Sequence, residues 1–308
     1  MMRAALLFLS EQKQINQFVR TNRMARKGVA RFVAGETLDT AAAAVRELNA
    51  KGATATLDLL GESVATPDDA RAATDAILQI FPRIAADKLD ANVSVKLTQL
   101  GLDLSPEIVR ANVKRLLDRA RDLGVFMRID MESSAHTQRT LELFEEVFPV
   151  YGRDVVGIVL QSYLHRSPQD AERANQLGAR VRLCKGAYKE PASVAHQAKA
   201  NVDASFVRIM EALMERGRYP GIATHDRNLI ARAKSFADAK GIGRDRFEFQ
   251  FLYGVSRDVQ EQLVREGYRV RVYTPFGTHW YPYFMRRLAE RPANVWFIVR
   301  SVLGEGRR

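Results

Sequence analysis

The feature that most constrains the fold is an eight-fold alternation of short strand patterns and longer helical patterns. Helix patterns open on signals such as Thr66-Pro67 and Ser105-Pro106, where a hydroxyl caps the helix and proline fits the first turn. Eight such units over about 250 residues predict a TIM-type (β/α)8 barrel, an α/β fold. The expected strands span residues 54–58, 92–96, 125–130, 155–161, 180–185, 221–225, 247–251 and 269–273.

A doubly wound parallel sheet is the alternative α/β architecture. It usually has fewer strands, and one that binds a dinucleotide tends to carry a glycine-rich first turn. The chain has no G-x-G-x-x-G, since Gly241-Ile-Gly243 lacks the third glycine and follows a helix pattern. We therefore expect the barrel.

Two helical segments flank the barrel pattern. Residues 1–50 show helix patterns at 12–33 and 38–48, so we expect an N-terminal helical segment over 1–50 and the catalytic barrel over 51–308. A last helix begins near residue 280, directly after the eighth strand, where it is expected to cap the C-terminal face of the barrel.

Polar side chains stand at the C-terminal ends of seven of the eight expected strands. Any one of them alone could be a solvated loop residue, but barrel active sites are built on that rim from several strands. Together they predict a functional rim, formed by Asp58, Lys96, Asp130, Gln161, Lys185, His225 and Tyr273.

The last helix carries a cationic face. Tyr283, Arg286, Arg287 and Glu290 lie at i, i+3, i+4 and i+7, so they share one side of the helix. Two planar guanidinium forks beside a phenol suit a small carboxylate ligand. The alternative is a solvated basic face.

Charge and composition narrow the partners and the compartment. The net charge of +11 arises from basic residues scattered among acidic ones, which argues against nucleic acid and allows peripheral contact with an anionic membrane surface. Cys184 is the single cysteine, which fits a reducing cytoplasm. No apolar run approaches the ~20 residues that span a bilayer, and the run at 4–9 is too short for a signal peptide. We expect a cytoplasmic protein, with contact at the inner face of the membrane allowed.

Several catalytic classes lack their motifs. The five histidines have no metal-binding spacing, so no metal is expected, and no G-x-S-x-G nucleophile elbow occurs. Lys96 at a strand end leaves a Schiff-base aldolase open.

Four motifs, in order along the chain, resemble the proline dehydrogenase family. They are Val181-Arg-Leu-Cys-Lys-Gly-Ala-Tyr188, Ala223-Thr-His-Asp226, Phe247-Glu-Phe-Gln-Phe-Leu-Tyr-Gly254 and Tyr283-x-x-Arg286-Arg287-x-x-Glu290. The resemblance runs from about residue 58 to residue 294 and is strongest to the short monofunctional bacterial members.

The resemblance implies a flavin-binding barrel that oxidises L-proline to Δ1-pyrroline-5-carboxylate. FAD would take the hydride at N5, and a membrane quinone would take the electrons. A separate pyrroline-5-carboxylate dehydrogenase would then use the product, because the chain shows no aldehyde dehydrogenase part. An alternative flavin barrel resembles methylenetetrahydrofolate reductase, although its folate would call for no Arg-Arg clamp.

The resemblance also assigns site residues. The catalytic residues would be Asp130, which we interpret as pairing with Lys96, and Arg182, beside flavin N5. The substrate residues would be Lys96, Leu252, Tyr273, Tyr283, Arg286 and Arg287. The other FAD contacts would be Met131, Gln161, Lys185, Gly186, Ala187, Tyr188, Thr224 and His225. Glu62 would pair with Arg286 as a gate that opens to admit proline.

Overall fold

The structure is a computed structural model that describes residues 28–61 and 63–290 of the chain. Its framework is a closed barrel of parallel strands in chain order, with β8 paired to β1. The predicted α/β barrel is thus confirmed. The strands are β1 (Thr54–Leu59), β2 (Ala91–Val95), β3 (Met127–Ile129), β4 (Val156–Gln161), β5 (Arg180–Cys184), β6 (Gly221–Ala223), β7 (Glu248–Leu252) and β8 (Arg269–Phe276).

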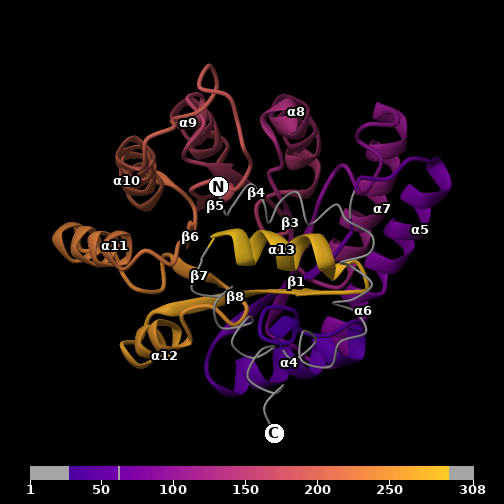
Figure 1. Ribbon diagram of the computed structural model, residues 1–308, viewed down its shortest axis with the longest axis horizontal. Helices are drawn as coiled ribbons and strands as arrows, with labels where there is room; N and C mark the ends of the chain where they lie inside the picture. The colour runs from indigo at the N-terminus through magenta and orange to yellow at the C-terminus, as the bar shows by residue number, and fades with distance from the viewer. Residues whose placement is uncertain (1–27, 62, 291–308) are drawn as a thin grey trace, which may run out of the picture.

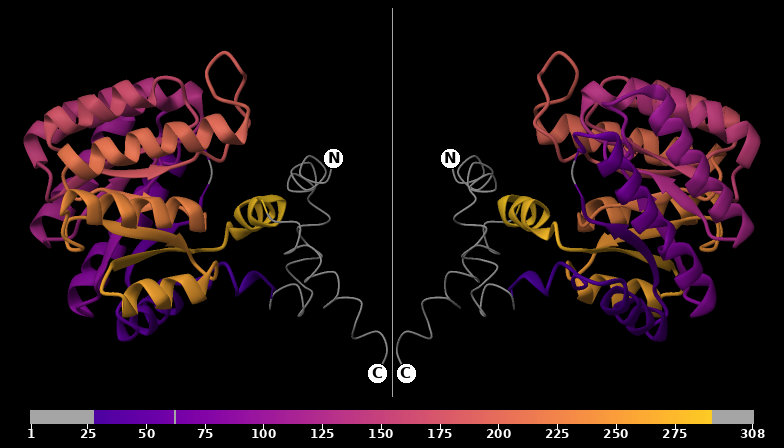
Figure 2. Two further views of the ribbon diagram at one scale, coloured as in Figure 1. Left: turned by 90° about the vertical axis from the view of Figure 1, so that its left-hand side faces the viewer. Right: turned by 90° about the vertical axis from the view of Figure 1, so that its right-hand side faces the viewer.

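Helices surround the barrel on its outside (Figure 1). A further helix, α13 (Trp280–Glu290), lies across one end of the barrel, beyond the strands (Figure 2). The surrounding helices are α4 (Leu38–Ala50), α5 (Pro67–Leu78), α6 (Ile80–Ala86), α7 (Pro106–Asp122), α8 (Ser134–Tyr151), α9 (Ser167–Leu177), α10 (Lys199–Arg216), α11 (Arg227–Lys240) and α12 (Arg257–Arg265).

The cap signals at Thr66 and Ser105 act as the sequence predicts. The Thr66 hydroxyl accepts a hydrogen bond from the Asp69 amide at the start of α5, and the Ser105 hydroxyl accepts from the Ile108 amide at the start of α7. Each bond satisfies one of the amides that a helix N-terminus leaves without a partner.

Three strands differ in length from the sequence prediction by two or more residues. β3 and β6 are shorter than the predicted 125–130 and 221–225. Directly after β6, the Thr224 hydroxyl accepts a hydrogen bond from the Asp226 amide at 3.1 Å, and this local turn competes with the strand ladder. β8 is longer than predicted because its pairing with β1 continues to Phe276.

The apolar core lies between the barrel and the helices. Alternate strand residues such as Leu57, Ile129 and Phe249 point outward into it and are fully buried. The barrel interior is polar instead, although most barrels of this class fill it with branched aliphatic side chains. Its buried polar residues include Thr56, Ser94, Arg128, Asp130, Arg182, Glu248 and Gln250.

A second apolar cluster holds α13 against the barrel end. Val29, Phe32 and Val33 pack there with Leu60, which follows β1, and with Trp280, Tyr281, Tyr283, Phe284 and Met285 of α13. The Trp280 indole N–H donates to Glu36 Oε1 at 2.8 Å. Leu60 places this cluster at the C-terminal face, so α13 caps that face as predicted.

The predicted N-terminal helices fall partly outside the described residues. α4 corresponds to the helix predicted at 38–48. Most of the helix predicted at 12–33 lies outside the described residues, and its described end forms a turn at 30–32.

Candidate active site at the C-terminal face of the barrel

Four charged side chains meet at the C-terminal face: Asp58, Lys96, Asp130 and Arg182, here called the charge quartet. The Lys96 ammonium donates to Asp58 Oδ1 at 2.7 Å and lies 3.8 Å from Asp130 Oδ2. The Arg182 Nη1 atom donates to Asp130 Oδ1 at 2.8 Å. The quartet carries two positive and two negative charges, so it is balanced and can remain buried.

The predicted pairing of Asp130 with Lys96 is only one part of this arrangement. Asp58 is the closer partner of Lys96, and the short contacts of Asp130 go to Arg182, Ser94 and Tyr273. Sequence reasoning noted Asp58 at a strand end but gave it no role. The contact between Asp58 and Lys96 depends on the register of β1 against β2, which sets Asp58 beside Ser94. The sequence alone does not show this register.

Tyr273 ties the quartet together. Its hydroxyl donates to Asp130 Oδ2 at 2.7 Å and accepts from the Lys96 ammonium at 3.3 Å. Burial, and then the charges of Asp130 and Asp58, raise the pKa of Tyr273 well above its ordinary value. Tyr273 therefore stays protonated and holds Asp130 by a hydrogen bond.

Lys96 is held in its charged form. Burial alone would lower the pKa of Lys96, but the charges of Asp58 and Asp130 outweigh it and raise the pKa above its ordinary value. A Schiff base needs the neutral amine as nucleophile. The environment of Lys96 therefore argues against the aldolase alternative and favours a role as a fixed cation.

The residues predicted to bind the flavin surround the same face. Gln161 ends β4, and its amide nitrogen donates to the Met131 carbonyl at 3.4 Å. His225 Nε2 accepts from the Leu252 amide at 3.0 Å, which places its proton on Nδ1. Thr224 is buried beside it.

Lys185, predicted to meet a pyrophosphate, forms ion pairs within the protein. Its ammonium lies 2.6 Å from Asp203 and 2.9 Å from Asp226. Gly186 follows with φ +111, and a Cβ there would lie 2.3 Å from the Tyr163 ring, so only glycine fits. Ala187 and Tyr188 are exposed on the loop that follows β5, which projects from the barrel in Figure 2.

These residues fit a flavin nucleotide. Within the described residues, Gln161 Oε1 and Asp58 Oδ2 are buried and accept no hydrogen bond from the protein. Buried acceptors without a donor cost free energy, and the N–H and O–H groups of a flavin nucleotide are suitable donors. Arg182 adds a buried cation of the kind that stabilises an electron-rich ring.

On α13, Tyr283 is buried and the Arg287 guanidinium lies 5.2 Å from the centre of its ring. The backbone of Arg286 belongs to the same helix, but its side chain lies outside the described residues. Glu62 lies outside them too, so the predicted gate between Glu62 and Arg286 remains a prediction.

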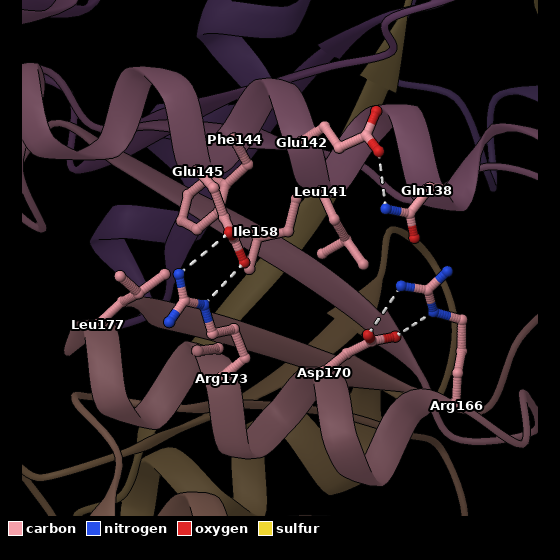
Figure 3. Close-up of a pocket in the computed structure, with 11 residues that line it drawn as sticks. Gln138, Leu141, Glu142, Phe144, Glu145, Ile158, Arg166, Asp170, Arg173 and Leu177 are labelled. Atoms are coloured by element: carbon pink, nitrogen blue, oxygen red, sulfur yellow. Dashed lines mark hydrogen bonds and ion pairs between the residues drawn. The ribbon is translucent and has the colours of Figure 1, made fainter.

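A hollow of about 90 Å³ lies elsewhere, on the outside of the barrel between α8 and α9 (Figure 3). Its cations pair within the hollow, Arg173 with Glu145 and Arg166 with Asp170. It is a groove between two helices on the outer side of β4, and no residue of the charge quartet lines it. Across residues 28–61 and 63–290, no cluster of potential metal ligands and no helix long and apolar enough to cross a membrane occurs.

Sequence reasoning missed the polar side chains inside the barrel. Glu248 and Gln250 alternate with Phe247, Phe249 and Phe251, and Gln250 Oε1 accepts from Arg182 Nε at 2.6 Å. The available sequence signal was the alternation of polar residues with phenylalanines, which indicates a strand with one polar and one apolar face. With the quartet above them, they define a (β/α)8-barrel enzyme with a candidate site at the C-terminal face.

A family model described as proline dehydrogenase matches residues 41–300, and the chain belongs to the proline dehydrogenase family. The chain is 39% identical over 303 residues to proline dehydrogenase 1 of Bacillus subtilis, covering 98% of this chain and 99% of that one. It is 40% identical over 304 residues to the proline dehydrogenase of Deinococcus radiodurans, covering 98% and 97%.

Solved structures agree with the fold. Proline utilization A from Bdellovibrio bacteriovorus, inactivated by N-propargylglycine, is similar with a TM-score of 0.82 and 25% identity. The match covers 92% of this chain and 34% of that one, so the chain spans about a third of that longer protein.

Proposed function

We propose that the chain binds FAD at the C-terminal face of the barrel and oxidises L-proline there to Δ1-pyrroline-5-carboxylate. The observation that carries the proposal is the largely buried charge quartet beneath α13, with the unsatisfied acceptors Asp58 Oδ2 and Gln161 Oε1, in a member of this family. The named relatives at 39–40% identity over nearly the full length support the substrate.

Proline offers a carboxylate as its main handle, and three cations would hold it. Lys96 supplies a charged ammonium at the barrel mouth, and Arg286 and Arg287 of α13 supply guanidinium forks. Tyr273 and Tyr283 would contact the pyrrolidine ring, with Leu252 as an apolar wall. Such a clamp restricts the orientation of a small zwitterion, which contributes to rate.

The flavin would lie against β3 to β6. Gln161 at the end of β4 and Met131 after β3 would contact it, as would Thr224 and His225 after β6. Gly186 has no side chain, so its backbone would permit a close approach of the cofactor. Beyond these, the proposed FAD contacts are Arg182, Lys185, Ala187 and Tyr188. When bound, FAD supplies a two-electron acceptor for the hydride that leaves proline C5.

Asp130 and Arg182 would act as one unit. Asp130 holds the Arg182 guanidinium by a charged hydrogen bond of 2.8 Å, and Tyr273 fixes the other oxygen of the same carboxylate. The proton stays on Tyr273 because its pKa is raised. Arg182 would thereby be kept as an oriented cation beside the flavin, where it would stabilise the negative charge of the reduced ring.

We further propose that Glu62 and Arg286 form a gate. Glu62 follows β1 and Arg286 lies on the helix that caps the same face, so an ion pair between them would close the mouth. Glu62→Ala should raise the KM for proline with little change in FAD content. An unchanged KM would count against the gate.

The electrons would pass to a membrane quinone, and a separate pyrroline-5-carboxylate dehydrogenase would use the product. The net charge of +11 would favour contact with an anionic membrane surface. We propose a cytoplasmic protein that meets the membrane peripherally.

The proposal is tested by identifying cofactor and product directly. The purified protein is denatured and the released cofactor identified by mass spectrometry; FAD is expected. A parallel incubation with L-proline and a quinone analogue should yield a compound lighter than proline by two hydrogens. Release of no flavin, or recovery of unchanged proline, would contradict the proposal.

A further inference from the structure

A chain of buried hydrogen bonds runs from Arg182 toward the N-terminal end of the barrel. Arg182 Nε donates to Gln250 Oε1 at 2.6 Å, and Gln250 Nε2 donates to Glu248 Oε1 at 2.5 Å. Arg271 Nε donates to the same Glu248 oxygen at 2.8 Å, and its Nη1 donates to the Ala55 carbonyl at 2.7 Å. These bonds connect the backbone of β1 to Arg182 through Arg271, Glu248 and Gln250, and this chain of hydrogen bonds is here called the relay.

The charge of Glu248 fixes which way the Gln250 amide faces. Burial alone would raise the pKa of Glu248, but the charge and hydrogen bond of Arg271 outweigh it, and the pKa lies below its ordinary value. An ionised carboxylate only accepts hydrogen bonds, so the NH2 group of Gln250 must face Glu248. The amide oxygen is then the end that faces Arg182.

This bond determines how the Arg182 guanidinium is oriented. Its Nε atom is used by Gln250, and its Nη1 atom by Asp130 at 2.8 Å and Ser94 at 3.2 Å. Nη2 has only a contact of 3.5 Å to Thr56, at the outer limit of a hydrogen bond. Asp130 alone would leave the planar group free to rotate about one contact, whereas Gln250 fixes its second edge.

Space for Gln250 is built into the neighbouring strand. Gly221 of β6 lies beside it, and a Cβ at that position would be 2.3 Å from Gln250 Nε2. Gln250 is buried and bonded at both ends, so it cannot move aside without losing a hydrogen bond.

We infer that Gln250, oriented by Glu248, is a positioning residue that sets the angle of the Arg182 guanidinium for proline oxidation. The inference rests on the proposed function and assigns to it residues of the barrel interior that touch neither the substrate clamp nor α13. Because the role of Gln250 is to orient Arg182, its loss should change kcat and the reduction potential of the flavin and leave proline binding unchanged.

Four variants of the FAD-loaded enzyme test the inference. Gln250→Met removes both bonds of the amide. Gly221→Ala removes no polar group but displaces Gln250. The double variant E248Q/Q250E exchanges the two side chains, so that a carboxylate accepts from Arg182 and an amide accepts from Arg271, with the total charge kept. Tyr219→Phe is the matched control, since Tyr219 donates only to the far oxygen of Glu248, at 3.2 Å.

The expected pattern separates positioning from general loss of structure. Gln250→Met and Gly221→Ala should each lower kcat about 10- to 100-fold, the scale of a small misplacement in an active site, with KM for proline within about two-fold. The flavin potential should become more negative, with FAD content unchanged. E248Q/Q250E should recover most of kcat, and Tyr219→Phe should match the wild type.

Three results would overturn the inference. One is an unchanged kcat and flavin potential in both Gln250→Met and Gly221→Ala. Another is a joint fall of kcat, FAD content and thermal midpoint with no recovery in E248Q/Q250E, which would make the relay merely structural. A wild type that lacks FAD or proline oxidation would overturn the proposed function and the inference together.

Discussion

At the scale of single residues, Lys96 has the most informative environment. It is a partly buried cation that two carboxylates hold in the charged form, beside a protonated phenol. Such a group is suited to binding an anion and unsuited to nucleophilic attack. The chemistry open to Lys96 is therefore set by its neighbours Asp58, Asp130 and Tyr273. The position of Lys96 at the end of a predicted strand does not identify these neighbours.

Lys96→Met should weaken proline binding. A charged hydrogen bond to the carboxylate contributes about 1.5–3 kcal/mol, so the Kd for proline should rise about 10- to 150-fold. Proline titration of the bound flavin measures the Kd, with FAD content and thermal midpoint recorded alongside. Lys114→Met is the control, because Lys114 is an exposed lysine of α7 paired with Asp118. Equal Kd values for Lys96→Met and wild type would remove Lys96 from the clamp.

Glu248 should make stability depend on pH in a predictable direction. Its folded pKa lies below its ordinary value, so its stabilisation is present above about pH 4 and is lost as pH falls through the lower folded pKa. At neutral pH, Glu248→Gln should lower the free energy of unfolding by about 3 kcal/mol, because it leaves the largely buried cation of Arg271 without its charged partner.

The difference between wild type and Glu248→Gln should therefore shrink as pH falls below 4. Denaturant unfolding at neutral and acidic pH measures it. Glu146→Gln, in an exposed pair with Arg110, should show little difference at either pH. If the difference in unfolding free energy between wild type and Glu248→Gln stays constant across this pH range, the carboxylate charge does not stabilise the fold.

At the scale of elements, Gly254 is the point where the barrel contacts the segment around Arg31, which leads into residues that pack against α13. Its φ is +74, and a Cβ there would lie 1.7 Å from the Arg31 carbonyl oxygen. Phe32 and Val33 follow and pack against α13. Because backbone meets backbone at this point, no side-chain rotation can relieve a clash.

Gly254→Ala should therefore destabilise the protein by about 1–3 kcal/mol more than Gly241→Ala does. Gly241 is the matched control, since its φ is +64 but nothing lies within 4 Å of its Cβ position. Thermal or denaturant unfolding compares the two. Equal losses of stability in the two variants would show that the close approach of the Arg31 backbone to Gly254 adds no constraint.

The order and number of strands could be predicted from the sequence because strand patterns alternate with helix patterns along the chain, and seven of the eight expected strands end in a polar group. The ends of β3 and β6 could not, since local turns such as that at Thr224 compete with the ladder. The relay of Gln250 and Glu248 was also missed. It depends on which strand residues point inward and on how eight strands are staggered, and only the closed barrel shows both.

At the scale of the whole molecule, the barrel has two separate kinds of interior. The layer between strands and helices is apolar and holds the fold together. The space inside the strands is filled by hydrogen-bonded polar and charged groups that lead up to the C-terminal face. The structure thus ties the positions of the site residues to the body of the barrel, and α13 closes the site from above.

The proposed function requires that proline reduces a flavin bound at this site. The most direct measurement is the visible absorption spectrum of the purified protein, recorded without oxygen before and after adding L-proline. We expect the bands of oxidised FAD to be present and to bleach with proline. A flavin spectrum that proline leaves unchanged, or a colourless protein that does not take up added FAD, would contradict the account.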